Sequence, residues 1–263
     1  MPYETILIDR RENGVALLVL NRPDAMNSLD GTLMRELPHA ARELSEDEDV
    51  RCIVLTGAGK VFCAGGDTRA IGKMADDQVK SASPPKSSFE KRAAWLAKCS
   101  QASLVLHEAP KPVIAMINGA CAGAGLNLAG ACDIRIAGAS AKFRSAFIAM
   151  GLSSDYGGNW LWTQILGTGK ARQLFFIDKK RDATEALEFG LIDRICDDDA
   201  LEAETLELAG QLASMPAKGM FYAKANLNAV LHQTLAQAID FESRNLMLCR
   251  AAITEMRKRA EAK

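Results

Sequence analysis

The chain has 263 residues, of which 48% are hydrophobic and 25% charged, and its formal net charge is −1. These values fit one large domain, or a domain with an appendage, and argue against a nucleic-acid-binding protein. The seven cysteines form no C-x-x-C pair, the N-terminus lacks the features of a secretory signal, and no run reaches the ~18 apolar residues of a membrane span. We therefore expect a cytoplasmic protein that binds neither nucleic acid nor membranes.

The N-terminal segment predicts a hairpin followed by a helix. Residues 4–9 mix apolar and polar side chains, residues 15–20 are all apolar, and an Asn-Gly turn separates the two segments. This pattern is a strong hairpin signal. A loop beginning at Asn-Arg-Pro ends this pair. Ser28 or Asp30 is then expected to cap a helix that runs to about Leu44.

A first glycine-rich turn follows the next predicted strand, residues 52–56, and extends to Asp67. A helix is expected after Asp67. It fades within residues 76–88, where the Ser, Pro and Lys content of residues 80–88 is typical of a mobile loop. Helical spacing resumes from Phe89 to His107.

A second glycine-rich turn, residues 118–125, follows the buried-strand pattern of residues 112–117, and a helix is predicted from Leu126. Small residues let backbone N–H groups come close to a ligand, and a helix start supplies free donors. The turn fits neither the dinucleotide fingerprint nor a phosphate loop. A backbone donor site remains, which could hold a phosphate, a carboxylate or an oxyanion.

The rest of the chain becomes increasingly helical. Two short strands are expected after the second turn, at 132–137 and 141–143, and a third at 191–196. Three short helices precede the last of these strands, and from residue 198 the pattern is almost entirely helical. We therefore predict a mixed core over residues 1–197 and a helical region over 198–263. The three short helices span 160–166, 171–176 and 183–189.

Four motifs together resemble the crotonase (enoyl-CoA hydratase/isomerase) family in order and spacing. The resemblance implies an α/β fold built as a spiral of ββα units, an acyl-CoA thioester substrate with no prosthetic group, and a role in fatty acid metabolism. It also implies a C-terminal helical trimerisation region and hence a homotrimer or a dimer of trimers. The motifs are Asn21-Arg-Pro-Asp-Ala-Met-Asn-Ser-Leu29, Phe62-Cys-Ala-Gly-Gly-Asp67, Asn118-Gly-Ala-Cys-Ala-Gly-Ala-Gly125 and Gly151-Leu-Ser-Ser-Asp-Tyr-Gly-Gly158.

By this resemblance, the backbone amides of Gly66 and Ala124 are the expected oxyanion donors. Two preorganised donors would stabilise the enolate oxygen that forms when a thioester loses a proton. Ala124 stands where relatives often have glycine, but the N–H is the functional group. Tight strand-to-helix packing explains either glycine turn alone and explains the pair poorly.

The resemblance also implies contacts with coenzyme A in the first two motifs and directly after them. Residues expected to touch the cofactor portion of the substrate are Ala25, Ala64, Asp67, Thr68 and Arg69. Two simpler interpretations stay open. The loop holding Ala25 is also a plain strand-to-helix connection, and Arg69 fits a solvated helix charge.

The acid–base residues depart from those of the family's hydratases, which carry two glutamates. Asn127 and Phe147 occupy those positions, and neither exchanges a proton near neutral pH. Asp155 matches the catalytic aspartate of family isomerases, and one carboxylate suffices to move a double bond. A pocket of Phe147, Trp160 and Trp162 would desolvate Asp155 and raise its pKa. The alternative is that Asp155 caps a helix.

These residues favour an enoyl-CoA isomerase, with Asp155, Gly66, Ala124 and Asn127 as catalytic residues. Asn127 would hydrogen-bond a polar substrate group or hold a water, or is simply packed in the core. One alternative is an enoyl-CoA hydratase in which Asp155 and Asn127 position water. The other is a non-catalytic CoA-binding protein. No metal site is expected, because the three histidines lie on predicted helices without a ligand motif.

Overall fold

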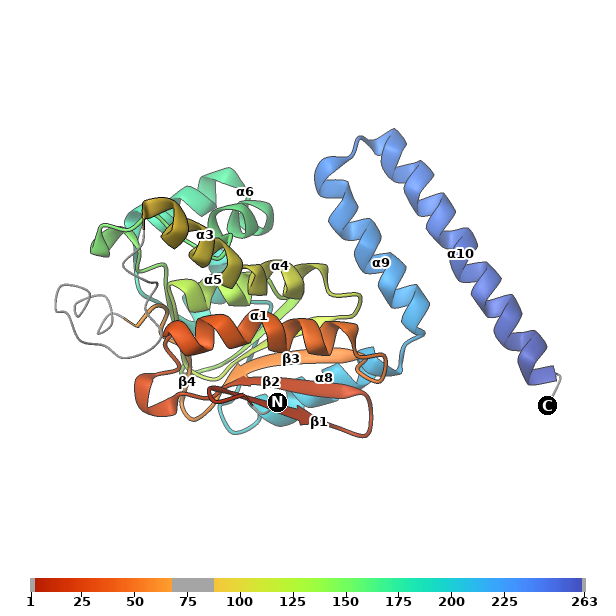
Figure 1. The fold of residues 1–263 in the computed structure, drawn as a ribbon, viewed down its shortest axis with the longest axis horizontal. Helices are drawn as coiled ribbons and strands as arrows, with labels where there is room; N and C mark the ends of the chain where they lie inside the picture. Colours follow the sequence, from red (N-terminus) through yellow and green to blue (C-terminus); the bar gives the residue numbers. More distant parts are fainter. Residues whose placement is uncertain (1–2, 68–87, 262–263) are drawn as a thin grey trace.

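The computed structural model describes residues 3–67 and 88–261, which form two β-sheets surrounded by helices and a two-helix arm at the end of the chain (Figure 1). The predicted helix after Asp67 and the predicted loop at 80–88, except for Ser88, lie outside the described residues. Thr68 and Arg69 lie outside them as well.

The larger sheet has six strands in the order β1-β2-β3-β5-β7-β10. β1 and β2 form the predicted antiparallel hairpin, and the other pairs are parallel. Every residue of β3 and β5 is buried, because α8 covers one face and the main core covers the other. The strands are β1 (Ile6–Arg10), β2 (Val15–Leu20), β3 (Cys52–Gly57), β5 (Val113–Ile117), β7 (Ile134–Gly138) and β10 (Arg194–Cys196).

Three of the four strands in the smaller sheet directly follow strands of the larger one. Its order is β4-β6-β8-β9, and β4, β6 and β8 run parallel. Thus β3β4, β5β6 and β7β8 each place one strand in each sheet, which confirms the predicted spiral of ββα units. The strands are β4 (Val61–Cys63), β6 (Ala120–Ala122), β8 (Lys142–Arg144) and β9 (Arg181–Asp182).

The helices of the core largely follow the predicted pattern. The Asp30 carboxylate caps α1 by accepting hydrogen bonds from two amides of its first turn, at 3.1 and 2.9 Å. The single helix predicted from Phe89 to His107 is wrong, because the chain breaks at Ser100 between α3 and α4. The elements are η1 (Pro23–Ala25), α1 (Gly31–Glu46), α3 (Phe89–Cys99), α4 (Gln101–Glu108), α5 (Ala124–Gly130), η2 (Ile148–Met150), α6 (Gly158–Ile177) and α7 (Ala183–Phe189).

The last three helices have different environments. α8 (Leu201–Ser214) packs on the larger sheet, whereas α9 (Ala217–Ala229) and, after η3 (Val230–His232), α10 (Leu235–Glu261) form the arm (Figure 1). Within the described ranges, no helix is both long and apolar enough to cross a bilayer.

One buried lysine ties the arm to the core. Lys224 Nζ on α9 donates to Asp133 Oδ2 at 2.7 Å, Lys111 O at 3.1 Å and Leu106 O at 3.3 Å. These acceptors lie at the end of α4, before β5 and between α5 and β7. A single side chain therefore fixes α9 against three core segments.

Candidate active site

The two glycine turns are in direct backbone contact. Gly65 has φ +91°, and a Cβ atom placed on it would lie 2.9 Å from Ala122 O and 3.4 Å from Ala124 N. Reciprocally, a Cβ on Gly125 would lie 2.4 Å from Cys63 O. Side chains have no room at either position, so the turns interlock through their main chains.

The Gly66 and Ala124 amides are left free by this arrangement. Leu29 forms a parallel bridge that uses Gly65 O, at 2.8 Å, and Asp67 N, at 3.1 Å, and thus skips the Gly66 N–H. Ala124 begins α5, so its N–H has no acceptor within the helix. Neither amide donates to another residue of the described ranges. Apart from its two chain neighbours, no described residue has an atom within 4 Å of the Cβ position of Gly66.

The predicted CoA residues Ala25, Ala64 and Asp67 come together from two segments. Ala64 N donates to Met26 O at 3.1 Å, which places the loop carrying Ala25 alongside the first glycine turn. Arg22 adds an ion pair to Asp67, with its Nη2 3.4 Å from Asp67 Oδ2. Sequence reasoning missed Arg22, since a cation beside a proline carries no signal that it reaches a residue forty-five positions away.

Asp155 carries a carboxylate in an unusual environment. Its Oδ1 atom is buried and has no hydrogen-bond partner among the described residues. Burial raises the pKa of Asp155 to about 6, and its own backbone N–H and the Asn127 amide only partly oppose this effect. Burial also raises the pKa of the Cys63 thiol to about 12, and the charge of Asp155 adds to that increase. Asp155 is thus electrostatically coupled to the first glycine turn.

The alternative in which Asp155 caps a helix is wrong. The N-cap of α6 is Gly157, with φ +71°, and no side chain caps this helix. Asp155 contributes only its backbone carbonyl, which accepts from Gly158 N at 3.0 Å. The carboxylate is therefore not used to start α6.

Asn127 holds the turn that carries Asp155. It is fully buried on α5, and its Nδ2 donates to Asp155 O at 2.9 Å and to Ser154 Oγ at 3.2 Å. A Cβ on Gly158 would lie 2.1 Å from the Asn127 side chain. Asn127 is thus wedged between the core helix and the Asp155 turn.

The three aromatic residues expected around Asp155 lie in different places. Phe147 is buried, and its ring tip lies 4.0 Å from the Cβ position of Gly123, beside the second turn. Trp162 is fully buried against Gly130, at the other end of α5. Trp160 is 38% exposed and packs between His107 and His232. Of the three, Phe147 directly flanks the interlocked turns.

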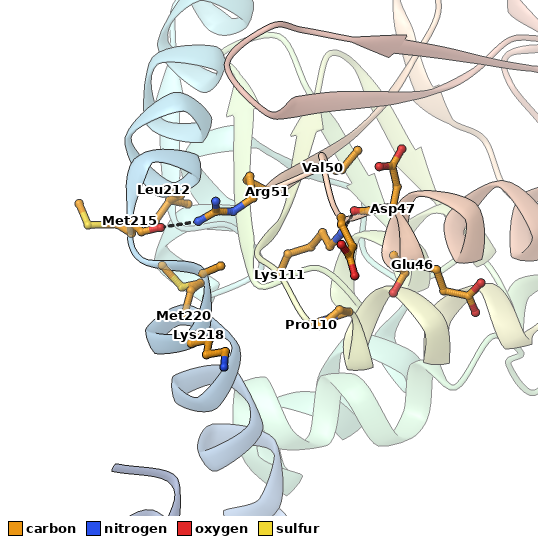
Figure 2. Close-up of a pocket in the computed structure, with 13 residues that line it drawn as sticks. Glu46, Asp47, Val50, Arg51, Pro110, Lys111, Leu212, Met215, Lys218 and Met220 are labelled. Atoms are coloured by element: carbon orange, nitrogen blue, oxygen red, sulfur yellow. Dashed lines mark hydrogen bonds between the residues drawn. The ribbon is translucent and has the colours of Figure 1, made fainter. Parts of the chain in front are cut away.

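The cavity shown in Figure 2, of about 450 Å³, lies elsewhere, where the end of α1 meets the junction of α8 and α9. Two of its cations, Lys111 and Arg51, donate to main-chain carbonyls. Lys111 Nζ donates to Leu44 O and Asp47 O at 3.0 and 2.6 Å, and Arg51 donates to Met215 O at 2.7 Å. None of the predicted site residues lines this cavity, so it adds no chemistry to the site.

The spiral of ββα units with interlocked glycine turns is the architecture of the crotonase superfamily. Within it, residues 10–257 match the family model described as enoyl-CoA hydratase/isomerase, and the chain belongs to that family. Its members are enzymes that use CoA thioesters without a prosthetic group. Both predictions from the sequence, the family and an enzyme, are confirmed.

Named relatives carry out more than one reaction. The chain is 35% identical to the 1,2-epoxyphenylacetyl-CoA isomerase of Escherichia coli (strain K12), over 90% of this chain and 87% of the relative. It is 31% identical to the crotonyl-CoA hydratase of Syntrophomonas wolfei, over 95% and 91%. A Thermobifida fusca YX structure in complex with CoA matches with a TM-score of 0.86 at 27% identity, over 95% of each chain. The family is therefore defined, and relatives divide between isomerases and hydratases.

Proposed function

We propose that this enzyme isomerises the double bond of an enoyl-CoA, with Asp155 as the single proton shuttle. The observation that carries the proposal is the buried, unpartnered Oδ1 of Asp155, whose pKa is raised to about 6. A group with this pKa is largely ionised at neutral pH and still returns a proton readily. Asn127 and Phe147 offer no second acid for hydration.

In the proposed reaction, the thioester oxygen of a 3-enoyl-CoA accepts hydrogen bonds from the Gly66 and Ala124 amides. The Asp155 carboxylate removes a proton from C2, and the electron pair of that C–H bond moves to form a dienolate with its charge on the oxygen. Asp155 then returns the proton to C4, which yields the 2-enoyl-CoA. The free amides supply stabilisation where charge develops, and losing one such donor typically costs ~10²–10³ in rate.

Asn127 acts in this scheme as a positioning residue. Its Nδ2 donates to Ser154 Oγ and to Asp155 O, so it holds the turn that positions the Asp155 carboxylate. Ala25, Ala64 and Asp67, together with Thr68 and Arg69, are proposed to hold the coenzyme A portion. The hydrogen bond from Ala64 N to Met26 O supports this placement. It joins the loop that carries Ala25 to the first glycine turn, next to the proposed oxyanion donors.

Turnover in heavy water tests the reaction. The protein is incubated with 2-enoyl and 3-enoyl thioesters, and products are analysed by mass spectrometry and NMR. Double-bond migration is expected, with deuterium entering C4 to the extent that protonated Asp155 exchanges with solvent before it returns its proton. Asp155→Asn should abolish migration, while the exposed helix variant Asp240→Asn retains it. A 3-hydroxyacyl product would instead assign a hydratase. CoA binding without turnover would assign a non-catalytic protein.

We also propose that the arm mediates self-association into a trimer or a dimer of trimers. Its helix α10 packs on α9 and leaves large apolar side chains about half exposed along much of its length. Light scattering of the full chain and of a variant with α10 apolar residues changed to glutamine tests this. A monomeric parent protein at micromolar concentration would contradict it. The half-exposed residues are Ile239, Leu246, Met247, Leu248 and Ile253.

A further inference from the structure

A cavity of about 380 Å³ lies between α4 and the start of α6. Tyr156 and Gly157, the two residues after Asp155, form part of its wall. Tyr156 is buried, and its φ of +49° turns the chain sharply between the acid and the helix. The cavity therefore begins directly beside the turn that carries the proposed proton shuttle.

The walls of this cavity are mainly apolar and rich in rings, and Ser100, Gln101 and Ser103 are the polar residues among the others. Tyr156, Trp160 and His107 contribute ring surfaces, and Leu104 and Leu161 contribute aliphatic ones. No Asp, Glu, Lys or Arg side chain is among the lining residues of the described chain. Burial and the nearby charge of Lys224 lower the pKa of His107, so its ring is neutral at neutral pH. The cavity therefore disfavours charged groups.

The outer wall is braced by the arm. His107 and Trp160 form a T-shaped pair with ring centroids 5.4 Å apart, and Trp160 stacks on His232 at 6.1 Å. His232 lies in η3, and Asn228 on α9 donates to His107 O at 3.0 Å. Three rings from α4, α6 and η3 thus hold each other in place, and the Trp160 ring is fixed before any ligand arrives.

We propose that this cavity selects acyl groups that end in an uncharged planar ring, with Leu104 and Trp160 as specificity-determining residues. The inference rests on the proposed function only in placing a CoA thioester at Asp155. A ring gains edge and face contacts with fixed aromatic walls beyond simple burial of area. A linear chain of equal carbon number instead loses the freedom of each bond that is immobilised.

Binding of saturated thioesters tests the selection independently of turnover, because these probes have no double bond to move. Isothermal titration calorimetry compares 5-phenylpentanoyl-CoA, undecanoyl-CoA with the same number of acyl carbons, and pentanoyl-CoA, which lacks the ring. The phenyl probe is expected to bind about tenfold more tightly than either linear one. Equal affinities for the phenyl and undecanoyl probes, or absence of binding by all three, would overturn the proposal.

Filling the cavity provides the second arm of the test. Leu104 is 44% exposed, so Leu104→Trp adds volume with little strain on the core, and Leu187→Trp on α7, at a residue 41% exposed, is the matched control. Leu104→Trp should lower the affinity for the phenyl probe by about tenfold and the affinity for pentanoyl-CoA by less than about twofold. Leu187→Trp should change neither affinity. An equal loss of affinity for both probes, or no loss for either, would contradict the assignment of this cavity as the ring-binding site. Failure of the catalytic proposal would appear separately, as selective binding without double-bond migration.

Discussion

Replacing Asp155 with asparagine should stabilise the protein while abolishing its activity. The pKa of this carboxyl is about 6 in the folded chain, against an ordinary value of 3.8. Because the folded-state pKa is raised, the folded protein holds the proton more tightly than the unfolded chain does. The stability contributed by protonated Asp155 is therefore present at acidic pH and is lost as the pH rises through about 6. Since each tenfold difference in proton affinity corresponds to about 1.4 kcal/mol, ionisation costs about 3 kcal/mol in all.

Between about pH 5 and about pH 8, ionisation of Asp155 lowers the free energy of unfolding by about 1.4 kcal/mol, given the same two pKa values. Asparagine has the same shape and no charge to bury. The difference in unfolding free energy between Asp155→Asn and the parent should therefore grow by about that amount over this range.

Urea denaturation followed by circular dichroism at the two pH values measures this difference. Asp240→Asn, at an exposed site on α10, is the control for the substitution itself and should leave the unfolding free energy close to that of the parent. A variant that is less stable than the parent at both pH values, or a gap that does not change with pH, would refute the view that Asp155 is held in a desolvated site.

Three further predictions concern the same scaffold. The kcat/KM for double-bond migration should fall about tenfold per pH unit below about pH 6, because the base becomes protonated; a flat profile would remove Asp155 as the base. Gly65→Ala should cost roughly 1–3 kcal/mol in urea denaturation and lower kcat, whereas Gly169→Ala, with open space around it, should be neutral or mildly stabilising. Lys224→Met should lower the free energy of unfolding by roughly 2–3 kcal/mol, because it removes the ion pair with Asp133. Adding Asp133→Asn should restore part of that loss. Additive effects of the two substitutions would show that the pair is not coupled.

Strands and turns were predictable where a local pattern determines the structure. β3 and β5 are buried on both faces and therefore appear in the sequence as continuous apolar runs. The Asn-Gly hairpin and the Asp30 cap follow from local turn and cap chemistry. The break at Ser100 was missed because the apolar spacing continues through it without a glycine or proline.

The candidate site was predictable in composition and less so in the role of each residue. Its motifs point to Gly66, Ala124 and Asp155, since a family resemblance transfers positions along the chain, and their catalytic roles stay a prediction. The bridge to Leu29 that leaves the Gly66 amide free depends on tertiary contact. The same holds for Asn127, whose amide nitrogen serves the Asp155 turn rather than open space. Local sequence does not encode these long-range partners.

The reciprocal fit of the two turns limits how this scaffold can change its reaction. Each turn presses a bare α-carbon, at Gly65 and at Gly125, against a carbonyl of the other. Moving one turn would therefore displace the other, so the fold fixes the spacing of the proposed oxyanion donors, Gly66 and Ala124. New chemistry is left to the side chains that surround this rigid pair, among them Asn127 and Phe147, where the family resemblance places the two glutamates of hydratases.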